Sequence, residues 1–298
     1  MTVIAVVGPT AAGKSALSIA LAQRLGGEVV NADSMQLYQG MDIGTAKLSM
    51  AEREGVPHHL LDIWPVSQTA SVAEYQVQAR AEIDKILERG RIPLLVGGSG
   101  LYVRAVLEDF DFPGTDTGLR VSLEAELAVV GPGEMHRRLA EIDPEAAAKI
   151  LPSNGRRIVR ALEVISLTGR PFTAALPADP KRVYEAVQIA VDRDDLDDRI
   201  EQRVENMWRE GFVDEVRRLE ARGLRKGITA SRALGYQQIL GFLDGSLSEE
   251  QAYLATITGT RRFVRRQRSW FRRDPSVVWL DGAARDAADQ ASAIIGRN

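Results

Sequence analysis

Short apolar segments alternate with amphipathic ones along the first third of the chain. Thr2–Val7, Glu28–Ala32 and Ile92–Val96 are brief, mostly apolar runs, which are typical of buried strands. Between them, apolar residues recur at helical spacing over Lys14–Leu25 and Val72–Glu88. Strands and helices in alternation predict an α/β fold, with a parallel sheet flanked by helices on both faces.

The pattern changes near Phe112, where the strand signal disappears. Up to about Pro180 the sequence shows helical periodicity interrupted by glycine and proline. The helices expected in this block are Leu119–Val129, Glu134–Ile142, Pro144–Ile150 and Asn154–Thr168. Leu176–Pro180 has the composition of an exit linker. We therefore predict a core made of residues 1–113 and 181–298, with an all-helical insertion at 114–180.

The last third of the chain returns to the earlier pattern. Val183–Val191 reads as a strand, so the sheet is expected to resume there. Apolar residues at helical spacing predict long helices over Leu196–Leu219 and Glu249–Phe271. Val277–Leu280 is expected to form the last strand.

The segment between the first strand and the first helix fits the phosphate-binding loop G-x-x-x-x-G-K-[ST]. Its residues are Gly8, Pro9, Thr10, Ala11, Ala12, Gly13, Lys14 and Ser15. Two glycines allow the backbone to approach an anion closely, and the helix N-terminus points N–H groups at it. Lys14 adds a positive charge, and the Ser15 hydroxyl is suited to hold Mg²⁺. The fold is therefore expected to be P-loop NTPase-like, and a nucleotide kinase or an NTPase is the simplest function.

An NTPase also needs a carboxylate at the end of a buried strand to help hold Mg²⁺. The strand Ile92–Val96 ends in glycines and Ser99, without an acid, whereas two other strands end in Asp33 and Asp192. For Asp192 we expect a role at the start of the following helix, where carboxylates favour the helix dipole. Asp33 and Ser99 lie at the carboxyl edge of the sheet, where ligands bind in open α/β folds. A turn-forming role remains open for both.

Composition limits the class of protein. Hydrophobic residues at 45% and charged residues at 27% of the 298 positions are ordinary for a globular chain. The chain has no cysteine, which excludes disulfides and thiolate metal sites. It also has no apolar run of membrane-spanning length and no signal-peptide pattern at its start. We expect a cytoplasmic monomer that does not bind membranes.

The net charge of −3 hides a dense basic segment. Arg261–Arg273 contains seven arginines, and Arg156, Arg157 and Arg160 form a smaller cluster in the helical block. A solvated helix face would explain such a run, but arginine also makes bidentate contacts with phosphate. Either diphosphate or an RNA backbone would suit these guanidinium groups.

Taken together, the motifs closely resemble those of bacterial tRNA dimethylallyltransferases, the IPP transferase family. The likeness covers nearly the whole chain and keeps the order of the motifs. The matching stretches are residues 8–15, 31–36 (NADSMQ), 40–47 (GMDIGTAK), 57–62 (PHHLLD), 92–102 (IPLLVGGSGLY), 160–164 (RALEV), 231–238 (SRALGYQQ), 260–267 (TRRFVRRQ) and 270–272 (WFR). Two positions depart mildly from the family pattern: Ser99 stands where Thr is frequent, and Val264-Arg265 replaces Ala-Lys.

The resemblance implies transfer of a dimethylallyl group from dimethylallyl diphosphate to N6 of adenosine 37, in tRNAs that read codons starting with U. Gly8–Ser15 would hold the diphosphate, with Mg²⁺ on Ser15. Asp33 would be the general base, and Ser99 would help to place the amino group. The helical insertion would hold the anticodon stem-loop. The residues implied to contact tRNA are Asp33, Ser34, Met35, Gln36, Ser99, Arg120, Arg156, Arg157, Ile158, Val159, Arg160, Arg232, Gly235 and Tyr236.

Other functions share the phosphate loop. An adenylate isopentenyltransferase or a small-molecule kinase would use it, but a small acceptor would not need the insertion and the arginine-rich segment. A P-loop RNA-binding module without transfer chemistry is a third interpretation. Asp33 and Ser99 beside an intact loop argue against it.

Overall fold

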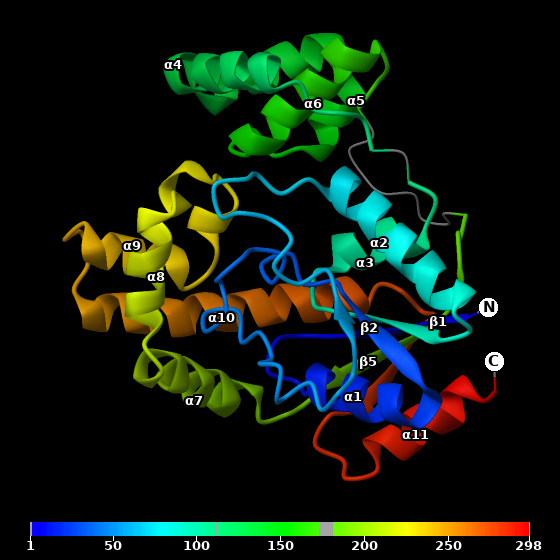
Figure 1. Cartoon of the computed structure of the whole chain (residues 1–298). Helices are drawn as coiled ribbons and strands as arrows, with labels where there is room; N and C mark the ends of the chain where they lie inside the picture. Colours follow the sequence, from blue (N-terminus) through cyan, green and yellow to red (C-terminus); the bar gives the residue numbers. More distant parts are fainter. Residues whose placement is uncertain (1, 111, 173–180, 298) are drawn as a thin grey trace. The chain divides into compact units, whose positions relative to one another are not determined.

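The computed structural model describes residues 2–110, 112–172 and 181–297. Contacts within the chain divide it into two compact units, one formed by Met1–Glu108 with Arg182–Asn298 and the other by Asp109–Lys181. We call them the sheet unit and the helical unit, and Figure 1 shows both. The sequence pattern alone had placed the two boundaries near residues 114 and 180.

A six-stranded sheet forms the centre of the sheet unit. Its strands are β1 (Thr2–Val7), β2 (Gly27–Asn31), β3 (His58–His59), β4 (Ile92–Val96), β5 (Glu185–Asp192) and β6 (Val277–Asp281). They lie in the order β3-β2-β4-β1-β5-β6, and every recorded pairing is parallel. The predicted α/β class with a parallel sheet is confirmed.

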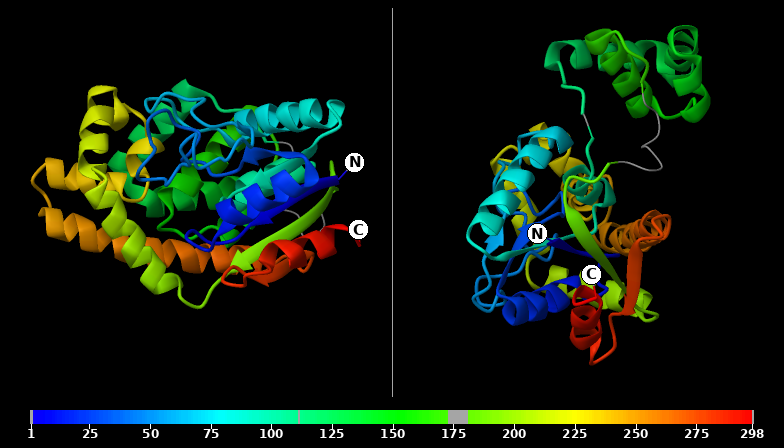
Figure 2. Two further views of the ribbon diagram at one scale, coloured as in Figure 1. Left: turned by 60° about the horizontal axis from the view of Figure 1, so that its bottom comes forward. Right: turned by 90° about the vertical axis from the view of Figure 1, so that its right-hand side faces the viewer.

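Alternate residues of β1 face opposite sides of the sheet, and both sides are covered. Val3, Ala5 and Val7 belong to one hydrophobic cluster, while Ile4 and Val6 belong to another. This is why the strand is apolar at consecutive positions. Figure 2 shows helices on both faces: α2 and α3 contribute to the first cluster, and α1 and α11 to the second.

The helices of the sheet unit alternate with strands in the first third of the chain, and four of them follow one another between β5 and β6. They are α1 (Lys14–Leu25), α2 (Val72–Glu88), α3 (Gly100–Leu107), α7 (Leu196–Arg209), α8 (Phe212–Ala221), α9 (Tyr236–Leu243), α10 (Glu249–Phe271) and α11 (Ala287–Ile295), with 3₁₀ turns at Leu224–Lys226 and Ala230–Arg232. α2 and α10 begin and end at the predicted residues. Ser71 and Ser248 cap them by accepting hydrogen bonds from backbone N–H groups of the first turn. No described helix is both long enough and apolar enough to cross a membrane.

The single long helix predicted over Leu196–Leu219 is wrong. α7 ends at Arg209 and α8 begins at Phe212, and between them Gly211 has a φ of 94°. This left-handed conformation ends a helix and favours glycine. The apolar periodicity continues through the break because both helices bury a face in the same unit.

The helical unit consists of α4 (Thr117–Ile142), α5 (Pro144–Lys149) and α6 (Gly155–Thr168) around its own core. α4 is interrupted at Gly131, which has a φ of 80° and precedes Pro132, so the two predicted helices are present with a break between them. The predicted linker Leu176–Pro180 lies outside the described residues.

The chain leaves and re-enters the sheet unit at one place. Glu108 and Arg182 form an antiparallel bridge, and the Val183 N–H donates to the Leu107 carbonyl at 2.8 Å. Within the helical unit, the Asp109 N–H donates to the Lys181 carbonyl at 2.8 Å. Both units therefore hold the two connecting segments side by side.

Gly97 packs between the ends of two neighbouring strands. It follows β4 and donates its N–H to the Val6 carbonyl at 3.1 Å. A Cβ atom at this position would lie 2.3 Å from the Ala32 carbonyl carbon and oxygen and 2.8 Å from the Asp33 nitrogen. These neighbours are backbone atoms, so the strands would have to move apart to accept a side chain.

We expect Gly97→Ala to lower the free energy of unfolding by about 1–3 kcal/mol, as overpacking does in other cores. Urea unfolding followed by circular dichroism measures this loss. Gly296→Ala is the matched control, because its added Cβ would have its nearest contact at 3.5 Å. The control should stay within about 0.5 kcal/mol of wild type, and equal stability of both variants would contradict the close packing at Gly97.

Candidate active site

The loop between β1 and α1 has the conformation of an anion-binding loop. Gly8, Ala11 and Gly13 all have positive φ angles, of 122°, 64° and 104°. A Cβ on Gly8 would lie 2.4 Å from the Val191 carbonyl oxygen, so only glycine fits there. Gly13 forms the N-cap of α1, whose N-terminus faces the loop. Ala11 is not a glycine, and its left-handed backbone stores strain of the kind found in ligand-binding loops.

Lys14 is placed to balance a negative charge in this loop. Its Nζ donates to the Pro9 carbonyl at 2.7 Å. Burial lowers its pKa to about 8, Asp33 opposes this shift and Arg203 adds to it. Lys14 therefore shares one site with a carboxylate from after β2 and a guanidinium from α7.

Two arginines of α7 contribute to the site, one at the phosphate loop and one at the loop of residues 40–47. Arg199 Nε donates to the Ala11 carbonyl at 2.9 Å, and one turn later Arg203 donates to the Thr45 carbonyl at 3.2 Å. Burial lowers the pKa of Arg203, Asp33 opposes the shift and Arg199 adds to it. Sequence analysis did not name either residue. Arg203 stands within the apolar stripe of α7, between Ile200 and Met207, and this was the available signal.

Asp33 and Ser99 lie together at the ends of the adjacent strands β2 and β4. Asp33 Oδ1 accepts the Met35 N–H at 2.9 Å. Ser99 Oγ accepts the Ser34 N–H at 3.2 Å and lies 3.3 Å from the Ser34 hydroxyl. Among the described residues, Asp33 Oδ2 has no hydrogen-bond donor, so this oxygen is available to a ligand.

Two buried tyrosines lie beside Asp33. The Tyr75 hydroxyl donates to the Asn31 carbonyl at 2.9 Å, and the Tyr75 and Tyr102 rings are 4.6 Å apart. Burial raises the pKa of both hydroxyls, and the Asp33 charge adds to both shifts. Both hydroxyls therefore stay neutral near pH 7.

The expected role of Asp192 at a helix start is wrong. Asp192 is the last residue of β5, and the N-cap of α7 is Asp195. The carboxylate of Asp192 instead binds Arg268 of α10, whose Nε lies 2.9 Å from both of its oxygens. The prediction failed because the partner comes from a distant part of the chain.

Comparisons with known proteins identify the family of the chain. The model of the family described as IPP transferase matches residues 36–274. A tRNA dimethylallyltransferase of Salinispora arenicola is 71% identical over 284 residues, which cover 95% of this chain and 83% of the relative. The chain belongs to the IPP transferase family.

Two solved structures share the fold of this IPP transferase. The tRNA isopentenylpyrophosphate transferase of Bacillus halodurans is 42% identical with a TM-score of 0.73, over 99% of this chain and 96% of that one. A eukaryotic dimethylallyltransferase acting on tRNA is 27% identical with a TM-score of 0.79, over 98% of this chain and 77% of that one. The P-loop-type parallel sheet is thus common to the family.

The site offers few protein ligands for a metal ion. The described residues include no group of three or more His, Cys, Asp or Glu side chains that could hold one. The exposed Ser15 hydroxyl in the first turn of α1 is the candidate ligand. Mg²⁺ commonly takes one or two protein ligands and completes its shell with phosphate oxygens and waters. This IPP transferase site therefore fits Mg²⁺ only together with a phosphate ligand.

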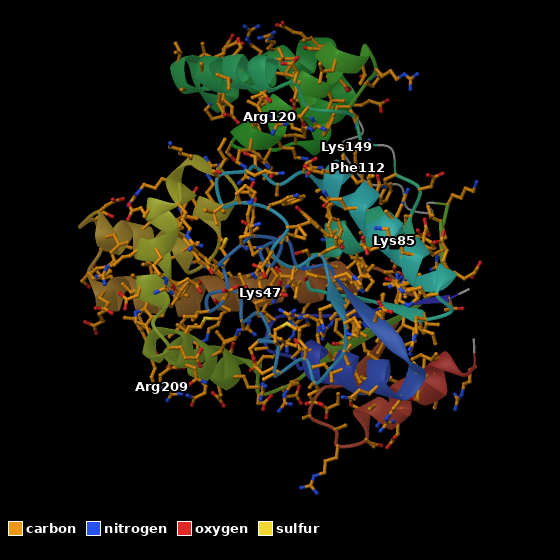
Figure 3. All side chains as sticks on the ribbon, viewed as in Figure 1. Lys47, Lys85, Phe112, Arg120, Lys149 and Arg209 are labelled. Atoms are coloured by element: carbon orange, nitrogen blue, oxygen red, sulfur yellow. The ribbon has the colours of Figure 1, made fainter. Side chains whose placement is uncertain are left out.

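A buried carboxylate holds the GMDIGTAK loop (residues 40–47) in place. Glu215 of α8 is 3% exposed and accepts the N–H groups of residues 42, 43 and 44 at 3.1, 2.7 and 3.2 Å. It also accepts the Tyr236 hydroxyl at 2.6 Å. The buried Lys47, labelled in Figure 3, binds Asp42 and Asp62 at 2.8 and 2.6 Å.

Some residues expected along an RNA path are buried in the sheet unit. Tyr236 is 0% exposed, and its hydroxyl donates to Glu215, the carboxylate that holds the loop of residues 40–47. A Cβ on Gly235 would lie 2.6 Å from the Phe212 ring. Arg232 is exposed, as are parts of Ser34, Met35 and Gln36. Of the three residues of this stretch expected to contact tRNA, Arg232 is therefore the one with an exposed side chain.

The expected residues of the helical unit also divide by exposure. Ile158 and Val159 lie in its core at 0% and 2% exposure, so their side chains do not reach the surface. Arg156 and Arg157 are exposed. Arg120 (labelled in Figure 3) and Arg160 both bind Glu163, which is fully buried. Burial raises the pKa of Glu163, but hydrogen bonds from both arginines outweigh this effect and lower it.

The arginine-rich segment is partly neutralised within the sheet unit. Arg261 binds Glu201 at 3.0 Å, and Arg268 binds Asp192. Arg265, Arg272 and Arg273 are exposed around a shallow hollow that Arg268 also lines. The buried Gln267 (5% exposed) lies on the other side of the helix, and sequence analysis missed it.

Lys14 should give anion binding a pH dependence. Its pKa of about 8 leaves it charged at about pH 7 and mostly neutral at about pH 9.5. A bound anion favours the charged form and raises the pKa, so binding takes up a proton above about pH 8. We expect the affinity of wild type for inorganic diphosphate to exceed that of Lys14→Met by a margin that shrinks as the pH rises. Isothermal titration calorimetry measures both affinities.

Lys14→Met is the reference protein for this comparison. The protonation of diphosphate itself changes with pH in the same way in both titrations, so it cancels in the difference between wild type and variant. Lys85→Met tests general electrostatics, since Lys85 (labelled in Figure 3) is an exposed lysine of α2. It should bind as wild type does. An unchanged margin across this pH range would show that Lys14 is not the titrating group.

Proposed function

We propose that this protein transfers the dimethylallyl group of dimethylallyl diphosphate to N6 of adenosine 37 in tRNAs that read codons starting with U. The observation that carries the proposal is the single site formed by Lys14, Arg203 and Asp33, with Ser99 at the adjacent strand end. The site thus combines two cations suited to a leaving diphosphate with a carboxylate suited to accept a proton. The family's names point to the same reaction.

The proposed reaction is a substitution at the allylic carbon of dimethylallyl diphosphate. The N6 lone pair would attack the allylic carbon, a carbon–nitrogen bond would form, and the carbon–oxygen bond to diphosphate would break. Asp33 Oδ2 would accept the proton that N6 loses. Lys14 and Arg203 would stabilise the charge that develops on the leaving diphosphate, and such fixed charges are effective in a partly buried site.

The loop would wrap the two phosphates with its N–H groups, from Gly8 to Ser15. Bound Mg²⁺, held by the Ser15 hydroxyl and by diphosphate oxygens, would add positive charge to the leaving group. Because the described residues offer so few metal ligands, Ser15 would hold the ion only together with oxygens of the diphosphate.

The acceptor base would have to leave the anticodon stack to reach Asp33. In the sheet unit, Ser34, Met35, Gln36 and Arg232 would contact the RNA around that base, and Ser99 would hydrogen-bond its amino group. In the helical unit, Arg156 and Arg157 are the exposed candidates for contacts with the anticodon stem-loop. Arg120 and Arg160 would contact RNA while keeping their ion pairs with Glu163. We expect the enzyme to act as a monomer in the cytoplasm.

A smaller acceptor is the principal alternative. An adenylate isopentenyltransferase or a small-molecule kinase would need the loop but not a separate helical unit. The relatives' shared name and the eukaryotic relative that acts on tRNA favour RNA as the acceptor. An RNA-binding module without chemistry would not need the unpaired oxygen of Asp33 beside Lys14.

The reaction can be tested directly. Purified protein, labelled dimethylallyl diphosphate, Mg²⁺ and unmodified tRNA with adenosines at positions 36 and 37 should give label in the tRNA, in the nucleoside at position 37. A tRNA with another base at position 37 should remain unlabelled. Label appearing in AMP, or phosphate released from ATP while tRNA stays unlabelled, would overturn the proposal.

Asp33→Ala should separate chemistry from binding. Loss of a general base lowers rates by about 10²–10⁴-fold, so we expect a single-turnover loss in that range. The dissociation constant for tRNA should change by less than about threefold, because one carboxylate contributes little to polyanion affinity. Filter binding and rapid-quench measurements give the two values.

Asp289→Ala is the matched control, because Asp289 is an exposed carboxylate of α11, far along the chain from the loop. It should behave as wild type in both measurements. Weak tRNA binding with a normal single-turnover rate in Asp33→Ala would assign Asp33 to recognition.

A further inference from the structure

Gln267 joins two segments that are distant in sequence. It lies in the buried stripe of α10 and is 5% exposed. Its Oε1 accepts the Thr10 N–H at 3.0 Å, and its Nε2 donates to the Gly98 carbonyl at 2.9 Å. One partner offers only a donor and the other only an acceptor, which suits an amide and no other side chain of this length.

The first of these bonds commits part of the phosphate loop to the protein. A loop of this type normally turns its N–H groups toward an anion. The Thr10 N–H is instead held by α10, two residues from the Gly8 that packs against β5. Gln267 therefore fixes the position of the loop from its outer side.

The second bond fixes the turn that carries Ser99. A Cβ on Gly98 would lie 2.2 Å from Gln267 Nε2, and one on Gly100 would lie 2.0 Å from Trp270 Nε1. The two glycines flanking Ser99 thus let α10 approach the turn closely. This gives the Gly-Gly-Ser-Gly sequence a physical reason.

The two bonds place the phosphate loop and the Ser99 turn at a fixed separation. Ser99 in turn contacts Ser34, next to Asp33. We propose that Gln267 is a positioning residue for the transfer step, holding the diphosphate loop and the acceptor-side turn in reacting register. The inference rests on the proposed function, because it assigns the donor to the loop and the acceptor to the turn.

Gln267→Met removes both hydrogen bonds but keeps the length and burial of the side chain. We expect its single-turnover transfer rate at saturating substrates to fall by about 10- to 10²-fold, since small misplacements of reacting groups have effects of this size. The dissociation constants for tRNA and for inorganic diphosphate should change by less than about threefold, which makes this a loss in kcat and not in binding. Thermal unfolding confirms that the variant is folded at the assay temperature.

Two further variants keep the test informative. Gln267→Glu retains an acceptor for Thr10 but sets a carboxylate against the Gly98 carbonyl, so it should also slow transfer. It replaces the methionine variant if that one does not fold. The double variant Ser99→Ala/Gln267→Met should lose less than the product of the two single losses, because Gln267 acts in part through the turn that carries Ser99. Fully multiplicative losses would contradict that part of the inference.

Gln290→Met is the matched control, since Gln290 is an exposed glutamine of α11 whose side-chain amide donates to Asp286 in the preceding helical turn. A transfer rate in both Gln267 variants equal to that of this control would overturn the inference. Weakened diphosphate binding with a normal rate at saturation would also overturn it. Failure of wild type to label tRNA would instead be a failure of the proposed function.

Discussion

The pairing of β4 between β1 and β2 is the constraint on which the site depends. Val96 is in register with Val6 on one side and with Asn31 on the other, and both pairings are parallel. Parallel strands end at one edge, so the residues that follow them are brought together whatever their separation in sequence. The phosphate loop, Asp33 and Ser99 follow β1, β2 and β4 respectively. Close packing at Gly97 holds those strand ends at contact distance.

Local patterns were sufficient for most of the architecture. α2 and α10 have the predicted ends because each combines a helical periodicity with a serine N-cap, and β4 has them because its apolar run is bounded by glycines. Asp33 and Ser99 could be placed at one edge because the strand–helix alternation implies parallel strands. The break at Gly211 was missed because the apolar periodicity is the same whether one helix continues or a second one begins.

The site residues that sequence analysis missed share one property. Arg203, Glu215 and Gln267 each occupy a position in the apolar stripe of a helix, yet each is polar. Glu215 and Gln267 are buried and Arg203 is half-buried, so each requires a partner, and the partners lie in loops far away in sequence. The pattern could have singled out these positions but not their partners. Likewise, the count of arginines in 261–273 overestimated the positive charge available to a ligand. Glu201 and Asp192, which come from other elements, form ion pairs with Arg261 and Arg268.

The hydrogen bond from Asp109 to Lys181 has a consequence for assembly of the sheet. β5 pairs with β1 only after a long excursion of the chain through the helical unit. The entropy needed to close a loop grows with the length of flexible chain between its ends. Once the helical unit has folded and holds Asp109 beside Lys181, the effective loop is only the few residues at the crossing. The sheet can then close as though the insertion were a short turn, so lengthening or shortening the insertion need not disturb the catalytic core.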